Sequence, residues 1–146
     1  AAAVGAHAVM PGHWLLVVDA GTAITYDVVS RDGEFLGGNI APGLDMRLHA
    51  LHEHTGHLPL IKHEALEHST DIFGRDTESA IAAGVVQGMI NEMEGYAHYL
   101  ASTHTDVCVF LTGGDAKYFH NRLKIATFAH PNLVLQGLNR ILLFNA

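Results

Sequence analysis

The feature that most constrains the fold of this chain is the stretch Trp14–Gly43, where apolar runs end in small and polar residues. It opens with the continuous apolar run Trp14–Val18, which is typical of a strand buried on both faces. That run leads directly into Asp19-Ala20-Gly21-Thr22. A carboxylate, a glycine and a hydroxyl therefore arrive together at the end of a buried strand.

Two further strands are expected in the same stretch. The β-rich run Ala23–Val29 is followed by a turn at residues 31–33, which leads into a third strand at Glu34–Leu36. The third strand then runs into the glycine-rich corner Gly37–Gly43. Three short strands with small residues at their bends predict an antiparallel meander whose corners bring the backbone close to a ligand.

The residues at these corners suit phosphate and a cation. Glycine lets main-chain N–H groups approach phosphate oxygens, a threonine hydroxyl can donate to phosphate, and an aspartate can hold a cation. A lone Asp-x-Gly-Thr could equally be a tight turn capped by its aspartate. The pairing of DxGTxxTxD at Asp19–Asp27 with GGxIxPG at Gly37–Gly43 is more specific. Asp27 is either a second polar group at this site or a structural acceptor.

The rest of the chain predicts alternating helices and strands. A long helix is expected from an N-cap at Asp76 or Thr77 to about Leu100, and its Gly84 and Gly88 would permit close approach of another helix. Val107–Leu111 reads as a buried strand, and the Gly113–Gly114 pair after it could present N–H groups to a nucleotide. The other expected elements are helices at Ala1–Met10, Gly43–Thr55, Asp115–Ile125 and Gly137–Phe144, an extended connection with short turns at Leu58–Ser69, and a short strand at Leu133–Leu135.

Composition limits the class of protein. A chain of 146 residues, 49% hydrophobic and 16% charged, predicts a single well-packed domain rather than a disordered segment. Its net charge of −7 argues against nucleic-acid binding. Its apolar runs are too short to span a membrane. The single Cys108 is expected to be a buried apolar residue, and a chain without disulfides is expected in the cytoplasm.

A histidine-rich segment allows a second hypothesis about metals. His49, His52, His54 and His57 fall within the predicted helix Gly43–Thr55 and just beyond it. Residues three apart share a helix face, but the segment does not contain HExxH. A solvated polar face is therefore the preferred interpretation, with an intrinsic metal site as the alternative.

The motifs together resemble those of the type III pantothenate kinases of bacterial coenzyme A synthesis. The resemblance is carried by the segments Asp19–Asp27 and Phe35–Gly43 and continues over most of the chain. The later matching segments are Ala50-Leu51, Leu58-Pro59, Gly74–Thr77, Leu111–Gly114 and Leu133–Leu138. The resemblance implies a ribonuclease H-like α/β fold of the actin, Hsp70 and sugar-kinase type, with a mixed sheet, an antiparallel meander and flanking helices.

By resemblance, residues of this chain acquire specific roles. Asp19 would bind a monovalent cation, K⁺ or NH₄⁺, with Mg²⁺ as a further candidate ion. Thr22 would contact ATP phosphate, Gly21 would let the chain pass close to the nucleotide, and Gly113 and Gly114 would lie beside the adenosine. Thr77 would reach pantothenate in the other subunit of a homodimer, or it would only cap its helix.

The resemblance also implies two motifs that this sequence does not contain. Family members carry an Asp-x-Gly-Asn-Thr phosphate loop and a Gly-x-Asp-Arg motif whose aspartate is the general base. The 146 residues are therefore expected to form one C-terminal ATPase-like domain, residues 1–146, of a two-domain kinase, with the base just upstream of Ala1 and no catalytic residue within the chain. The alternatives are a non-catalytic dimerisation or partner-binding fragment, like the relatives described as transcription accessory factors, and another sugar-kinase-like enzyme.

Overall fold

A computed structural model describes residues 1–66 and 71–146 of the chain. Ser69, at the end of the predicted connection Leu58–Ser69, and the adjoining Thr70 lie outside the described residues. The helices are α1 (Ala2–Val9), α2 (Leu44–Glu53), α3 (His63–Leu66), α4 (Thr77–Thr103), α5 (Ala116–His120) and α6 (Leu133–Asn145). The strands are β1 (Trp14–Ala20), β2 (Ala23–Val29), β3 (Phe35–Pro42), β4 (Val107–Thr112) and β5 (Phe128–Ala129).

The strands form one mixed sheet in the order β3-β2-β1-β4-β5. β1, β2 and β3 pair antiparallel as the predicted meander, whereas β4 pairs parallel with β1, and β5 parallel with β4. Leu15–Val18 at the centre of β1 are all buried. The continuous apolar run therefore marks the central strand, and the predicted fold class is confirmed.

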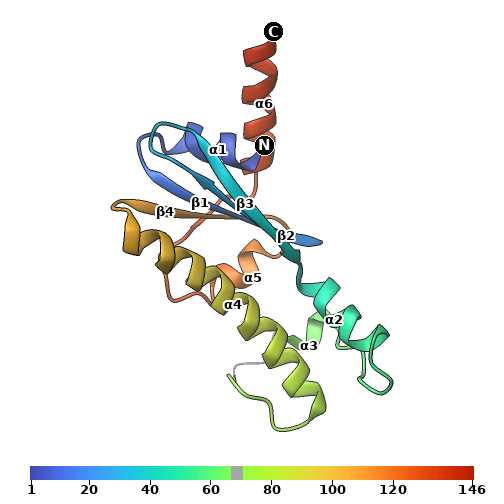
Figure 1. Ribbon diagram of the computed structural model, residues 1–146. Helices are drawn as coiled ribbons and strands as arrows, with labels where there is room; N and C mark the ends of the chain where they lie inside the picture. The colour runs from blue at the N-terminus through green and yellow to red at the C-terminus, as the bar shows by residue number, and fades with distance from the viewer. Residues whose placement is uncertain (67–70) are drawn as a thin grey trace.

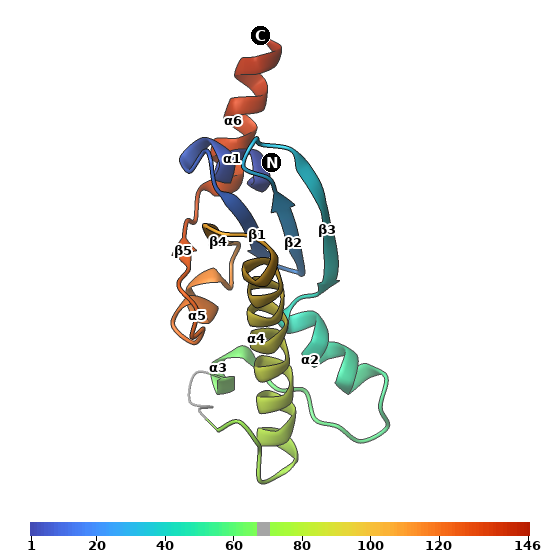
Figure 2. The ribbon, with the colours of Figure 1, turned by 60° about the vertical axis from the view of Figure 1, so that its left-hand side comes forward.

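Helices cover both faces of this sheet, so that side chains alternate between two cores. Leu16 and Val18 belong to the larger core, with residues of α2, α4 and α5. Leu15 and Val17 belong to a smaller core, with Ala2 and Ala6 of α1 and Leu133 of α6. Figures 1 and 2 show α1 and α6 at one end of the molecule, with α2, α3 and the start of α4 at the other.

Helix α1 crosses α6 with backbone against backbone. A Cβ on Gly5 would collide with the carbonyl oxygen of Leu133 and would lie 3.1 Å from the Gly137 nitrogen. Beyond this crossing, α6 extends away from the sheet (Figure 1) and exposes Leu142, Leu143 and Phe144. The two glycines thus permit the contact between the first and last helices.

Helix α4 is capped at one end and packs against the sheet at the other. Of the two residues predicted as its N-cap, Asp76 is the one observed, and the Asp76 carboxylate accepts from the Ser79 N–H at 2.8 Å. Near the other end, His104 packs edge-on against Trp14 of β1, with ring centroids 3.6 Å apart. Among the described residues, none approaches a Cβ position at Gly84 or Gly88. None of the described helices is both long enough and apolar enough to cross a bilayer.

A polar bridge joins α2 and α4 to the meander. Arg47 of α2 donates to Glu92 of α4 at 2.6 Å and to the Pro42 carbonyl oxygen at 2.7 Å. Tyr26 of β2 donates to the same Glu92 carboxylate at 3.3 Å, and burial, with the Glu92 charge, raises the pKa of Tyr26. These contacts fix the direction in which α2 and α4 leave the sheet.

The sequence interpretation was wrong about three elements. β3 is longer than the predicted Glu34–Leu36, because its glycine-rich half continues to pair with β2 as far as Pro42. The helix predicted at Asp115–Ile125 ends at His120, because the chain turns there, with Arg122 and Leu123 N–H groups donating to the Phe119 carbonyl. Leu133–Leu135 is helical rather than a strand, because Leu133 and Gly137 form one helical face against α1.

Candidate functional site

The C-terminal ends of β1 and β4 bring most of the predicted ligand-binding residues together. Because the two strands are parallel, Asp19 lies beside Thr112 and the turns that follow them are adjacent. The Asp115 N–H donates to the Ala20 carbonyl oxygen at 3.0 Å and joins the turns. Carboxyl ends of strands are where ligands bind in many open α/β sheets. One edge of the sheet is therefore lined by Asp19, Gly21, Thr22, Gly113 and Gly114.

Two glycines make the close approach at this edge possible. Gly113 has φ of +91°, and a Cβ there would lie 2.6 Å from Asp19 Oδ1. Gly43, the N-cap residue of α2, donates its N–H to the Thr22 carbonyl oxygen at 3.0 Å. A Cβ on Gly43 would overlap the carbonyl oxygen of Gly21. The turn between β1 and β2 is thus held between the β4–α5 turn and the start of α2.

Two carboxylates share the sheet face at this edge. Asp19 pairs with Thr25, and Asp27 pairs with Val17, so that Asp19 and Asp27 are diagonal neighbours on one face. Burial raises the pKa of both carboxyl groups, and the Asp19 charge raises the pKa of Asp27 further. No described residue donates a hydrogen bond to either carboxylate.

The carboxylate of Asp27 lies above the backbone of β3. Its Oδ1 is 2.6 Å from the position that a Cβ on Gly38 would take. A structural role for Asp27 would require a hydrogen-bond donor, and the described residues provide none. Its position on the Asp19 face is consistent with the other interpretation, a second polar group at the site.

Thr112 is a polar residue of this edge that sequence reasoning missed. Its side chain is 1% exposed, and its hydroxyl oxygen has no hydrogen-bond partner among the described residues. Leaving a buried hydroxyl unpaired costs about 1–3 kcal/mol. The available signal was its position at the end of a buried strand, directly before the glycine pair.

The oxygen atoms at this edge fit a hard cation. Carboxylate and hydroxyl oxygens are the ligand types that such cations prefer. Asp19 provides a partly buried carboxylate without a hydrogen-bond donor, and Thr112 a buried hydroxyl without a partner. Across residues 1–66 and 71–146, no three histidine, cysteine, aspartate or glutamate side chains cluster in a way that could hold a metal.

Thr77 lies apart from these residues. It is the first residue of α4 and is exposed, at the end of that helix farthest from the sheet (Figure 1). It lines an open groove of about 1130 Å³ between α2 and α4. The other residues of the groove are Pro42, Met46, Arg47, Ala50, Leu51, His54, Thr55, Leu58, Ala80, Ile81, Gly84 and Val85. Within one copy of the chain, the structure does not bring Thr77 to the Asp19 edge.

The histidine-rich segment makes local contacts. The His52 ring nitrogen Nδ1 lies 2.7 Å from the Leu58 carbonyl oxygen, and His49 lies 3.4 Å from Glu53, one turn along α2. These contacts favour the solvated-face interpretation over an intrinsic metal site. Cys108 is partly buried next to the smaller core, where burial raises the pKa of its thiol.

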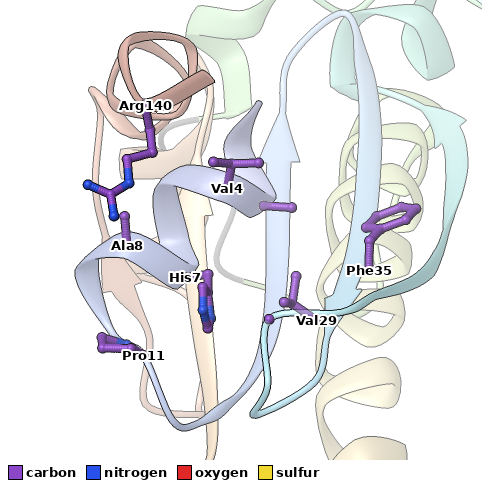
Figure 3. A pocket seen from close by; sticks show the side chains of 9 residues that line it. Val4, His7, Ala8, Pro11, Val29, Phe35 and Arg140 are labelled. Atoms are coloured by element: carbon purple, nitrogen blue, oxygen red, sulfur yellow. The ribbon is translucent and has the colours of Figure 1, made fainter. Parts of the chain in front are cut away.

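A separate pocket lies at the opposite end of the sheet from Asp19. It has a volume of about 330 Å³, and α1, α6 and the β2–β3 turn enclose it (Figure 3). Val29 and Phe35 line one side of it, and His7 and Arg140 lie on the helical side. It contains none of the residues predicted to bind a ligand.

The sheet order and the flanking helices define the class of the protein, a ribonuclease H-like α/β fold of the actin, Hsp70 and sugar-kinase type. Ethanolamine utilization protein EutJ from Carboxydothermus hydrogenoformans shares the fold at 20% identity, with a TM-score of 0.50 over 92% of this chain and 51% of its own. A component of the PilM–PilN type IV pilus biogenesis complex shares it at 15% identity, with a TM-score of 0.52 over 88% of this chain and 40% of its own.

Sequence comparison narrows this class to one family. The family model for type III pantothenate kinase matches residues 1–99, and the chain belongs to that family. A type III pantothenate kinase of Porphyromonas gingivalis is 49% identical over 99% of this chain and 59% of its own length. One from Bacteroides fragilis is 50% identical over 99% of this chain and 58% of its own. The chain thus spans somewhat less than two thirds of these relatives.

A solved structure with higher identity comes from Campylobacter jejuni. It is 27% identical to this chain, with a TM-score of 0.66, and the match covers 97% of this chain and 62% of that one. It is described as a Baf family transcriptional activator.

Proposed function

We propose that the protein containing these 146 residues is a pantothenate kinase, which transfers the γ-phosphoryl group of ATP to pantothenate and yields 4′-phosphopantothenate, the first step of coenzyme A biosynthesis. Membership of the family supports this proposal. The observation that carries it is the meeting of the Asp19–Thr22 turn with the Gly113–Gly114 turn at one sheet edge. Phosphoryl transfer depends on such positioning and on neutralising phosphate charge.

Each site residue has a proposed task in this reaction. Gly21 and Thr22 contact the ATP phosphates, and Gly113 and Gly114 lie beside the adenosine. Asp19 holds a monovalent cation, K⁺ or NH₄⁺, and Mg²⁺ accompanies the nucleotide. When bound, the monovalent cation offsets negative charge next to the phosphates. Residues 1–146 form the C-terminal domain, and the general base lies upstream of Ala1. The proposed location of the enzyme is the cytoplasm.

The assay for this proposal uses the full-length protein with ATP, pantothenate and potassium. We expect ADP release to depend on pantothenate, and mass spectrometry to detect the phosphorylated product. A rate of ATP turnover that is independent of pantothenate but increases when a sugar is added would support the sugar-kinase alternative. Absence of any turnover would support a non-catalytic partner-binding protein, which the description of the Campylobacter jejuni structure favours.

The two threonines are expected to affect different substrates. Thr22→Val should raise the KM for ATP about fivefold or more, because one hydrogen bond to phosphate is worth about 1 kcal/mol or more. Thr77→Val should instead raise the KM for pantothenate. Steady-state kinetics with each substrate varied in turn measures both values. Thr103→Val is the control, because Thr103 is exposed at the end of α4 opposite Thr77 and beside the start of β1, where Trp14 meets His104. Equal effects of Thr22→Val and Thr77→Val on both substrates would contradict the assignment.

We further propose that the enzyme is a homodimer in which Thr77 completes the partner's site. The separation of Thr77 from the Asp19 edge and the open groove beside it support this arrangement. Asp19→Ala and Thr77→Arg dimers should each be inactive. When the two variants are mixed, dissociated and reassociated, about half of the dimers should be heterodimers, and each heterodimer contains one intact site out of two. The mixture should therefore regain up to about one quarter of wild-type activity. No recovery in a mixture shown to contain heterodimers would contradict a shared site.

A further inference from the structure

The proposed roles leave two buried polar atoms near this edge unused, the hydroxyl of Thr112 and the ring nitrogen Nδ1 of His130, whose backbone N–H donates to the Leu111 carbonyl oxygen at 2.8 Å. Thr112 is almost fully buried, and its Oγ1 has no partner among the described residues. Buried hydroxyls in folded proteins nearly always have a hydrogen-bond partner or an ordered ligand. Valine has almost the same shape as threonine, so packing alone does not explain the hydroxyl.

The pairing of the strands fixes what Thr112 faces. Across β4, β1 and β2, Thr112, Asp19 and Thr25 form one row of directly paired residues. Directly paired residues project from the same face of a sheet. Phe110 precedes Thr112 on this face of β4 and is buried in the smaller core. The apolar core therefore ends where the row that contains Thr112 and Asp19 begins.

The charge at this row favours a cation over a phosphate group as the partner of the hydroxyl. The Asp19 carboxylate lies in the row and the Asp27 carboxylate is its diagonal neighbour. Two carboxylates repel a phosphate oxygen and attract a cation. A threonine oxygen has two lone pairs that can coordinate such an ion.

We propose that Thr112 Oγ1 is a ligand of the monovalent cation at Asp19 and that Asp27 provides the second negative charge facing it. This inference rests on the proposed kinase function and on the cation-binding role of Asp19. Asp19 supplies the charged oxygen, and Thr112 supplies a neutral oxygen from the neighbouring strand. The cation thereby joins the ends of β1 and β4, and the glycine pair that follows Thr112 is fixed relative to Asp19.

The test measures cation binding directly in the full-length protein. The melting temperature is followed as potassium chloride replaces choline chloride at constant ionic strength, because a ligand that binds the native state raises it. Thr112→Val should raise the half-saturating potassium concentration about tenfold, whereas Thr112→Ser, which keeps the hydroxyl, should stay within about threefold of wild type. Without potassium, Thr112→Val should be at least as stable as wild type, because the unpaired buried hydroxyl is gone.

The outcomes separate this inference from the proposed function. Unchanged potassium binding in Thr112→Val, alongside weakened binding in Asp19→Asn, would overturn the role of Thr112 and leave the kinase proposal intact. A wild-type protein that potassium does not stabilise would overturn the inference, and absence of phosphopantothenate would overturn the kinase proposal independently. Thr112→Ala, which also lacks the hydroxyl, provides the same comparison if the valine variant does not fold.

Discussion

Gly5→Ala is expected to lower the free energy of unfolding by about 1–3 kcal/mol, although alanine is ordinarily the better helix former by up to ~1 kcal/mol. The added methyl group would meet the Leu133 carbonyl oxygen at the crossing of α1 and α6. Gly5 and Leu133 both belong to helices, and neither backbone can shift alone, so the two helices must separate to accommodate the methyl group. Separation would loosen the smaller core, which includes Ala2, Ala6 and Leu133.

Urea denaturation followed by circular dichroism measures this effect, and Gly95→Ala is the matched control. Gly95 is also helical, but it is exposed, and no described atom lies within 4 Å of its Cβ position. The control should gain up to about 1 kcal/mol from helix propensity. A similar gain for Gly5→Ala would show that α1 and α6 do not meet in solution as they do here.

Asp19→Asn is expected to raise the potassium concentration for half-maximal activity of the full-length kinase about 10- to 100-fold. The substitution keeps the shape of the side chain and removes its charge. Interactions with charged groups are worth about 1.5–3 kcal/mol, and each 1.4 kcal/mol corresponds to a factor of ten. The defect should diminish as potassium is raised, which separates lost cation affinity from damage to the fold.

Asp32→Asn is the control for this charge change. Asp32 lies in the exposed turn between β2 and β3, at the end of the sheet remote from Asp19. Its substitution should leave the potassium dependence unchanged. Equal potassium dependence of Asp19→Asn and wild type would reject Asp19 as a cation ligand and would require another source of charge compensation.

The sheet and most of its site edge could be predicted because the signals are local. The run Trp14–Val18 is apolar at every position, which marks a central strand, and Asp19 and Gly21 follow it in sequence. Likewise, the glycine pair follows the run Val107–Leu111 directly. Each run therefore predicts a buried strand that ends in a possible ligand-binding turn, whereas a common nucleotide site for the two turns was implied only by the family resemblance.

The remaining features depend on contacts that are distant in sequence. Leu133–Leu135 is apolar at every position, a pattern common to strands and buried helices, and its packing against α1 makes it helical. The Thr112 hydroxyl could not be assigned from sequence, because its importance arises from the pairing of β4 with β1 and from the burial of its oxygen. For the same reason, the groove beside Thr77 could not be predicted.

The edge-on contact between Trp14 and His104 gives the protein an internal optical probe. Trp14 is the only tryptophan among these 146 residues. Within this part of the protein, intrinsic emission excited at long wavelength therefore reports on one location, where the first residue of β1 meets the C-cap of α4. Ligands that shift α4 relative to the sheet should change the intensity and the wavelength of that emission, because both depend on the neighbours of the indole ring and on its exposure to water. Movements of the helix that carries Thr77 can therefore be timed without attaching a dye.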